Sequence, residues 1–333
     1  MSRSRREWRG ALAAERRLVI GTRGSKLAVW QAHFIRARLE GVTGLEVCLE
    51  IIRTTGDRVV DVPLAKVGSK GLFTKEIEVE LAAGTIDVAV HSMKDVPTQA
   101  PDGLVIAAMP ERVDPRDVLV SRGGMSLGTL PKEARVGTSS LRRIAQLRAL
   151  RPDLTIVDVR GNLDTRMRKA EEGEVDAVVL AAAGLTRMGW ADRISHYLSF
   201  AQMVPAVGQG AIGVQIRADD DFMAQTCEQL NDSMTMTCVD AERVVMRLLE
   251  GGCQVPIGAN ARIEGEKLVM DGVVASLDGT RVVRATVEGG PAEGEAVGRE
   301  MVATLLDQGA GEILAQVRAA AGPEGAVDTL LET

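Results

Sequence analysis

Residues 91–97 read HSMKDVP and come directly after the apolar run 88–90, which is typical of a buried strand. In open α/β sheets, the segment that follows a strand lies at the mouth of the ligand-binding crevice. Asp95 in this segment can therefore act as a general acid and base, and its carboxylate can stabilise a cation. Taken alone, the residue is more readily explained as an aspartate that caps the turn before Pro97.

A second reactive group is the thiol of Cys253, in the segment 251–258 that reads GGCQVPIG. The flanking glycines and proline place it on a loop after a helix, where a thiol is accessible and can act as a nucleophile. Taken alone, a free cysteine is more often a small buried apolar residue.

Basic and hydroxyl side chains gather after the expected strands of both halves of the chain. Hydroxyls and free backbone N–H groups at a helix start bind anions, and arginines add forked donors. In the second half these residues are Thr138, Ser139, Ser140, Arg142, Arg143, Arg160, Arg166 and Arg187; in the first half they are Arg23, Ser25, Lys66 and Lys70. Any one of the basic residues, taken alone, is more readily explained as a solvated surface charge. Together, in a chain of net charge −6, they predict a ligand with several carboxylates or phosphates.

The composition narrows the class of protein. The chain has 333 residues, 45% hydrophobic and 26% charged, as expected for two or three soluble globular domains. Its acidic balance and its few aromatic residues argue against a nucleic-acid partner. No apolar run approaches the roughly 20 residues of a membrane span. The four cysteines form no CxxC pair and there are three histidines, so we expect no metal site.

The first 17 residues contain six arginines and no apolar core of a secretory signal. We expect a basic, disordered extension over residues 1–17, although a transit peptide would also be arginine-rich. Free thiols fit a reducing compartment, and we expect a cytoplasmic protein.

Two sequence patterns recur along the chain, and they predict two similar lobes of alternating strands and helices. Apolar runs ending in Gly-Thr, at 18–22 and 134–138, each precede an amphipathic helix. The runs 84–90 and 173–179 also resemble each other, and Gly84 and Gly173 are placed as left-handed residues beyond a helix end. The fold class expected is α/β, with two doubly wound lobes and a smaller C-terminal α/β domain that has an antiparallel sheet.

Two crossings, near 109–115 and at 204–210, would join the lobes and form a hinged cleft between them. We expect residues 18–112 and 208–229 in the first lobe, 113–207 in the second, and 230–333 in the C-terminal domain. Residues 208–213 match GxGxxG, but a strand over 214–216 follows where a dinucleotide fold needs a helix. We interpret this segment as an inter-lobe connection.

Six segments taken together resemble the porphobilinogen deaminase family, in family order and over nearly the whole chain from Ile20 to near Gln316. They are 20–28 (IGTRGSKLA), 67–73 (VGSKGLF), 91–97 (HSMKDVP), 137–143 (GTSSLRR), 160–166 (RGNLDTR) and 251–256 (GGCQVP). The family's first two domains are like the lobes of periplasmic binding proteins.

The resemblance implies an enzyme that condenses four porphobilinogen molecules, with loss of ammonia, into hydroxymethylbilane for tetrapyrrole (haem) synthesis. It implies a dipyrromethane cofactor held by a thioether to Cys253, and Asp95 as the catalytic carboxylate. Cofactor contacts would come from Ser25, Lys94, Thr138, Ser139, Ser140, Arg142, Arg143 and Arg160. Substrate contacts would come from Arg23, Lys66, Lys70, Ser92, Arg166 and Arg187.

The alternative from another class is a non-catalytic, two-lobe anion-binding protein. It would explain the lobes and the basic cleft, but not a cysteine on a glycine loop in a third domain. Family habit suggests a monomer whose only partner is its small-molecule substrate.

Overall fold

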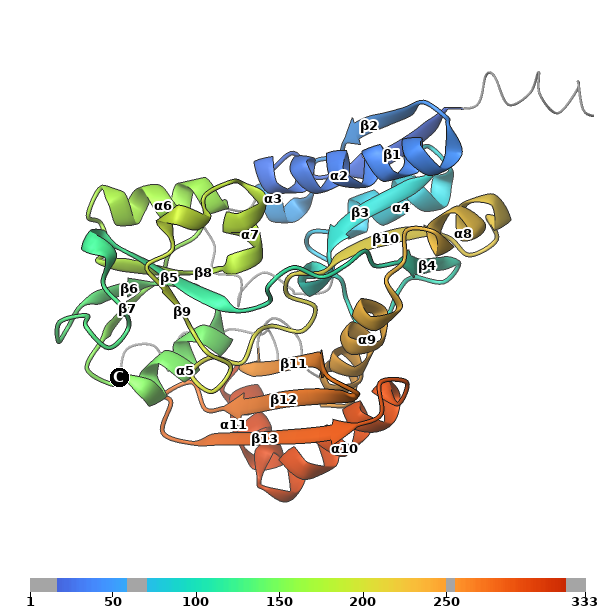
Figure 1. Cartoon of the computed structure of the whole chain (residues 1–333). Coiled ribbons are helices and arrows are strands. Elements are labelled where there is room, and N and C mark those ends of the chain that lie inside the picture. Colours follow the sequence, from blue (N-terminus) through green and yellow to red (C-terminus); the bar gives the residue numbers. More distant parts are fainter. Residues whose placement is uncertain (1–16, 59–70, 250–254, 322–333) are drawn as a thin grey trace, which may run out of the picture.

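The computed structural model describes residues 17–58, 71–249 and 255–321. Three sheets, each with its own helices, lie side by side in it (Figure 1). None of the helices in these ranges is both long enough and apolar enough to cross a bilayer.

The first sheet has the strand order β2-β1-β3-β10-β4. Its strands are β1 (Leu18–Thr22), β2 (Val47–Ile51), β3 (Val88–Ser92), β4 (Leu104–Ala108) and β10 (Ile212–Arg217). β1 runs parallel to β2 and β3, whereas β10 is antiparallel to β3 and β4. The helices are α2 (Lys26–Thr43), α3 (Thr55–Arg58), α4 (Lys75–Ala83) and α8 (Asp221–Glu228). Apolar residues of α2 and α8 pack on one face of the sheet, and those of α4 pack on the other.

The second sheet has the order β7-β6-β8-β5-β9. Its strands are β5 (Asp117–Ser121), β6 (Arg135–Gly137), β7 (Thr155–Val157), β8 (Ala177–Ala181) and β9 (His196–Tyr197), and its helices are α5 (Leu141–Leu150), α6 (Leu163–Glu171) and α7 (Ala182–Arg187). In β8, Ala177 and Val179 face α5, whereas Val178 and Leu180 face α6 and α7. Burial on both faces explains why this strand is a continuous apolar run.

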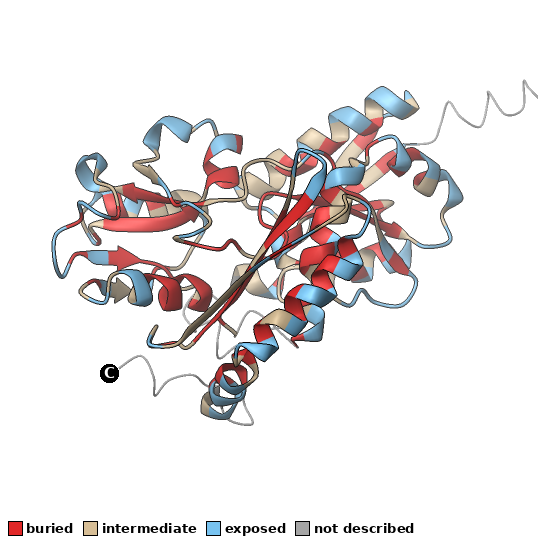
Figure 2. Ribbon diagram, turned by 60° about the horizontal axis from the view of Figure 1, so that its bottom comes forward, coloured by how far each residue is buried: buried red, intermediate tan, exposed pale blue. Residues whose placement is uncertain are grey.

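The third sheet is antiparallel, with β11 (Ile257–Glu264), β12 (Lys267–Ala275) and β13 (Val282–Gly289) in chain order. Helices α9 (Ser233–Leu248), α10 (Gly294–Asp307) and α11 (Ala310–Ala321) cover it. The inner strands of the sheets are mostly buried, the edge strands β2, β7 and β13 are only partly buried, and the outer helix faces are exposed (Figure 2). The predicted fold class, two doubly wound lobes and a small domain with an antiparallel sheet, is confirmed.

Local signals in the sequence set several element boundaries. The side chain of Ser25 accepts a hydrogen bond from the backbone N–H of Ala28 and caps α2. Gly84 and Gly173 have φ of 74° and 79°, the left-handed conformation that the sequence predicts for both. The predicted strand after the GxGxxG match is present as β10, so that match does not open a helix.

The chain passes between the first two sheets twice, from β4 to β5 and from β9 to β10. A buried carboxylate on α9 holds both passages. Glu242 accepts two hydrogen bonds from Arg112, at 2.6 and 3.1 Å, and one of 2.7 Å from the backbone N–H of Gly208. The third domain thus fixes the geometry of both inter-lobe connections.

The third domain also packs on the second lobe. Leu141 and Ile144 of α5 belong to the same apolar cluster as sheet β11–β13. The turn between β12 and β13 contains Gly279, with φ of 74°, and a Cβ there would lie 2.6 Å from the backbone nitrogen of Ala149. Only glycine fits this close approach.

Candidate functional site

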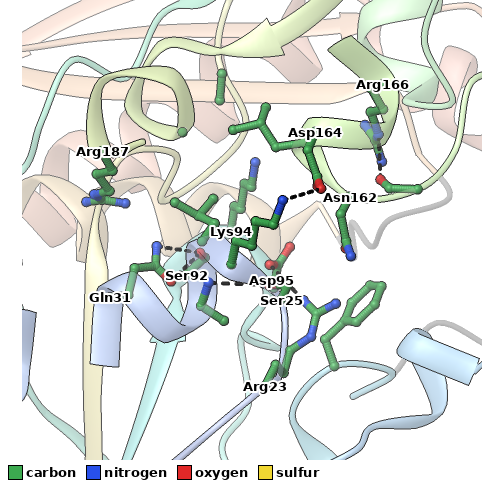
Figure 3. Close-up of a pocket in the computed structure, with 18 of the residues that line it drawn as sticks. Arg23, Ser25, Gln31, Ser92, Lys94, Asp95, Asn162, Asp164, Arg166 and Arg187 are labelled. Carbon is green, nitrogen blue, oxygen red and sulfur yellow. Dashed lines mark hydrogen bonds and ion pairs between the residues drawn. The ribbon is translucent and has the colours of Figure 1, made fainter. Parts of the chain in front are cut away.

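A cavity of about 1270 Å³ lies between the first two sheets. Lobe-one segments around Arg23–Gln31, Ile51–Asp57 and Val90–Asp95 line one side, and lobe-two segments 158–169 and 180–190 line the other. Side chains from both lobes point into the same space in Figure 3.

Asp95 ends a one-turn 3-10 helix, Met93–Asp95, that follows β3 directly. Met93 is buried and packs closely against Gly208 and Gly213, where a Cβ would lie 2.8 and 2.3 Å from Met93 atoms. Arg243 of α9 donates hydrogen bonds to the carbonyls of Val96 and Pro97, at 3.2 and 2.7 Å. Both ends of this short helix are therefore anchored while the carboxylate lines the cavity.

The Asp95 carboxylate accepts no hydrogen bond from the described residues, so no turn cap is present there. Among the described residues, its nearest cation is Arg23, whose Nη1 lies 4.0 Å from Oδ2 of Asp95. Arg23 is fixed by Asp57, with 2.6 Å between Nη2 and Oδ1, and its guanidinium lies 4.1 Å from the ring centre of Phe73. Burial alone would raise the pKa of Asp57, but hydrogen bonds and charge from Arg23, with Thr54, hold it below its usual value.

Cations surround this carboxylate. Lys94 is exposed, yet the exposed surface faces the cavity interior, where protein surrounds the ammonium. Desolvation lowers its pKa to about 8, against the opposing effect of Asp95. Burial also lowers the pKa of Arg166 and of Arg187 to about 10. Nη1 of Arg160 is buried without a hydrogen-bond partner. The cavity therefore holds positive charge that lacks a compensating anion.

Two of the predicted cofactor ligands, Arg142 and Arg143, are held by a buried carboxylate. Arg142 and Arg143 both pair with Asp117, at 2.7 Å each, and all three side chains are buried. Burial would raise the pKa of Asp117, but the two arginines lower it far below its usual value. Arg143 also lines the cavity, whereas Arg142 does not and instead donates to the carbonyl of Val204 at 2.6 Å. In this structure Arg142 is thus a structural ion-pair partner.

Of the hydroxyl residues predicted to bind the ligand, some line the cavity and others do not. Ser25 and Ser92 line the cavity. Thr138, Ser139 and Ser140 do not: the Ser139 hydroxyl donates to the carbonyl of Val159 at 2.7 Å, and Thr138 accepts from the backbone N–H of Ser140. Lys66, Lys70 and Cys253 lie outside the described residues.

The structure adds lining residues that the sequence reasoning missed. Gln31 donates to the Ser92 hydroxyl at 2.9 Å, and Asn162 faces the same space (Figure 3). Lys26 and Asp164 form an exposed ion pair of 3.0 Å that joins the two lobes. For Gln31 the sequence does contain a signal, because it is a polar residue within the apolar stripe of α2. The structure shows that its side chain is 2% exposed.

Two of the other cysteines, Cys227 and Cys238, are buried and poorly suited to nucleophilic chemistry. Burial raises the pKa of Cys227 to about 12 and that of Cys238 to about 11. Thiolate is the reactive form, so both thiols are suppressed at neutral pH.

The arrangement combines the Asp95 carboxylate, which has no short ion pair, with several desolvated cations and neutral hydrogen-bond donors. It can bind a molecule with several carboxylates and can place an acid–base group or a counter-charge beside its reacting centre.

The family models and the relatives identified by sequence name the same family. The family model "Porphobilinogen deaminase, dipyromethane cofactor binding domain" matches residues 18–225, and "Porphobilinogen deaminase, C-terminal domain" matches residues 236–307. A porphobilinogen deaminase of Syntrophobacter fumaroxidans is 52% identical over 91% of this chain and 98% of its own length. One of Desulforudis audaxviator is 53% identical over 92% and 99%. Among solved structures, the VFT2 domain of Bordetella pertussis BvgS has a TM-score of 0.40 and 15% identity, over 69% of this chain and 92% of that one.

Proposed function

The chain belongs to the porphobilinogen deaminase family, and we propose that it is a transferase that joins four porphobilinogen molecules head to tail into hydroxymethylbilane, with loss of ammonia. One observation carries this proposal: the carboxylate of Asp95, free of a short ion pair, faces a cavity lined by unpaired or desolvated cations. Every porphobilinogen carries an acetate and a propionate, so a growing chain of pyrroles is a polycarboxylate that such a cavity suits.

The cavity also fits the dipyrromethane cofactor, which carries four carboxylates. The buried and unpartnered Nη1 of Arg160 supports this fit, because a buried guanidinium nitrogen without a partner is costly until an anion reaches it. Arg143, Arg160, Lys94 and Ser25 would hold the cofactor's carboxylates. When bound, the cofactor supplies the pyrrole carbon to which the first substrate is joined.

Asp95 has the central part in the proposed chemistry. Loss of ammonia from porphobilinogen leaves a methylene pyrrolenine cation, and a carboxylate beside it stabilises that charge. The same carboxylate would orient the leaving amine and take up the proton released when a new carbon–carbon bond forms. Arg23, Ser92, Arg166 and Arg187 would hold substrate carboxylates, joined by Lys66 and Lys70. A charge-assisted hydrogen bond contributes roughly 1.5–3 kcal/mol, so several are needed to retain intermediates.

We propose Cys253 as the attachment point, through a thioether. The raised pKa values of the Cys227 and Cys238 thiols support this choice, since neither thiol is a good nucleophile. For Thr138, Ser139 and Ser140 at the start of α5, contact with the cofactor stays a prediction. We propose that Arg142 acts on the cofactor through Asp117, which also holds Arg143.

Intact-mass measurement of the purified chain tests the proposal. We expect an added mass of two linked pyrroles, a peptide map that places it on Cys253, and turnover of porphobilinogen to hydroxymethylbilane. Cys253→Ser should lack the adduct and almost all turnover, whereas Cys48→Ser should keep both. A chain without adduct or turnover that still binds polycarboxylates would instead be the non-catalytic anion-binding protein. We further propose that the enzyme is a cytoplasmic monomer serving tetrapyrrole synthesis.

A further inference from the structure

A buried row of polar side chains runs behind the Asp95 segment, from β3 through β10 to α4, which are neighbouring elements of the first lobe (Figure 1). Nε2 of His91 lies 2.9 Å from Oε1 of Gln215. The amide nitrogen of Gln215 donates to Oε1 of Glu78 at 3.1 Å, and Thr74 donates to Oε2 of the same carboxylate at 3.3 Å. The four side chains are between 0% and 7% exposed, so water does not compete for these bonds.

This row fixes which nitrogen of His91 carries the hydrogen. The carboxylate of Glu78 only accepts, so the amide nitrogen of Gln215 must face it, and the amide oxygen must face His91. That oxygen also only accepts, so the hydrogen lies on Nε2 of His91. In the neutral ring, Nδ1 is then a bare acceptor.

The surroundings keep the ring neutral. Burial is the largest effect and lowers the pKa of His91 to about 4, while Asp95 raises it and Arg23 lowers it further. The polar and charged groups that face the ring are Arg23 after β1, Asp95 after β3, Glu78 on α4 and Gln215 on β10. At neutral pH the ring therefore brings a lone pair, and no additional positive charge, to the side of the cavity where Asp95 lies.

His91 lines the cavity, and its Nδ1 has no hydrogen-bond partner among the described residues. The cavity is rich in donors, from arginine, lysine and serine. Of its other carboxylates, Asp57 and Asp164 are paired, and Asp158 lies on the second lobe, across the cavity from the Asp95 segment. Porphobilinogen carries two N–H donors close to its reacting carbon, the pyrrole N–H and the aminomethyl ammonium. Both need acceptors beside Asp95.

Resting on the proposed function, we propose that Nδ1 of His91 accepts a hydrogen bond from a substrate N–H and holds the reacting pyrrole against Asp95. His91 is then a substrate-binding residue, and Gln215 and Glu78 are positioning residues that set its tautomer. Of the four side chains in this row, only His91 and Thr74 line the cavity.

Two substitutions at one position separate this role from a structural one. His91→Gln can keep a donor to Gln215 but removes the acceptor at the Nδ1 position, whereas His91→Asn keeps a polar atom near Nδ1 and loses the bond to Gln215. We expect His91→Gln to keep the thermal stability of the wild type and to lower kcat/KM about tenfold, the scale of one lost hydrogen bond. We expect His91→Asn to be the less stable variant and to retain more of its kcat/KM. The reverse order of kcat/KM would overturn the proposal.

A porphobilinogen analogue with methyl in place of aminomethyl identifies the donor. It keeps the pyrrole N–H and lacks the ammonium. If His91→Gln weakens inhibition by this analogue about tenfold, the pyrrole N–H is the donor. If only porphobilinogen itself is affected, the donor is the ammonium.

Nitrogen NMR of histidine-labelled wild-type holoenzyme tests the tautomer without reference to turnover. The chain has three histidines, and exposed His33 and half-buried His196 can be assigned by substitution. We expect His91 to be neutral with hydrogen on Nε2 from pH 6 to 8, and its Nδ1 resonance to move when the methyl analogue or porphobilinogen binds. Hydrogen on Nδ1, or an Nδ1 resonance that neither ligand moves, would overturn the inference and leave the deaminase activity standing. An inactive wild-type chain would instead count against the proposed function.

Discussion

Nη1 of Arg23 lies 4.0 Å from Oδ2 of Asp95, at the outer limit of an ion pair, while the same guanidinium holds Asp57 at 2.6 Å. Arg23 is thus committed to another carboxylate, and Asp95 is left without a short ion pair. A pair at this distance with both side chains partly exposed contributes little to stability. The carboxylate of Asp95 is therefore better explained by an interaction with a ligand in the cavity than by a contribution to folding stability.

Asp95→Asn keeps the shape of the side chain and removes its charge. We expect little change in the free energy of unfolding, retained substrate binding, and a fall in kcat of at least about 100-fold, the scale of a lost acid–base or charge-stabilising group. Steady-state kinetics with porphobilinogen, together with urea unfolding, would measure both effects.

The matched variant is Asp95→Glu, which keeps the charge and moves it by one methylene. It should retain more activity than Asn. Near-normal kcat in the Asn variant would require another acid in the cavity.

The lowered pKa of Lys94 predicts a pH dependence of cofactor assembly on the apo chain. Desolvation brings this pKa to about 8, so the ammonium loses its proton as the pH rises through that range. If Lys94 holds a cofactor carboxylate, the rate of cofactor assembly on the apo chain, followed by intact mass, should be steady below pH 8 and fall above it, because the neutral amine attracts the carboxylate less. We expect a pH profile from 6 to 10 to show this fall.

Lys94→Arg is the control, because a guanidinium stays charged over the whole range. Its profile should remain flat above pH 8, and Lys94→Gln should be about tenfold lower at pH 7 with no step. An unchanged step in Lys94→Gln would assign the titration to another group.

The buried thiols give a prediction for chemical modification. Burial raises the pKa of Cys227 to about 12 and of Cys238 to about 11, so the thiolate fraction at pH 8 is very small. Iodoacetamide at pH 8 should leave both unmodified in the folded protein and modify both in urea, as read by peptide mass spectrometry. Rapid modification of either thiol in the folded state would show that these positions open to solvent.

The sequence predicts the fold well because its signals are local. The apolar run of β8, the left-handed Gly84 and the capping Ser25 each act through their immediate neighbours. Asp95 and Arg160 could also be predicted as cavity residues, since both follow strands and the ends of parallel strands meet at one edge.

Residues whose role depends on a distant partner could not be predicted in this way. Asp117 lies at the head of an apolar run, which shows only that a charge is buried there. Its partners are 25 and 26 residues away, and nothing local distinguishes Arg142, which the structure pairs with it, from a ligand for the cavity. The same holds for His91, because its partner Gln215 lies 124 residues further along the chain and no local pattern connects the two.

The Asp117 cluster leads to the last prediction, which separates structural arginines from binding arginines. The Asp117 side chain is completely buried and accepts from Arg142, Arg143 and Gln209, at 2.7, 2.7 and 3.0 Å. Because the arginines hold its pKa far below the usual value, its contribution to stability is present above about pH 4 and is lost as the pH falls below that value.

Arg142→Leu removes one of the two cations and leaves a buried carboxylate short of a partner. Removal of one member of a buried ion pair typically costs about 3–5 kcal/mol, and we expect a loss of this size in urea unfolding at pH 7. The matched control is Arg160→Leu, which removes a guanidinium with an unpartnered buried nitrogen that lines the cavity. It should leave the free energy of unfolding almost unchanged and impair cofactor assembly. In a double-mutant cycle, Arg142→Leu should cost much less in an Asp117→Asn background, because the charge it would leave unpaired is already gone. Equal costs in both backgrounds, or a stable Arg142→Leu variant that lacks only the adduct, would return Arg142 to the set of direct cofactor ligands.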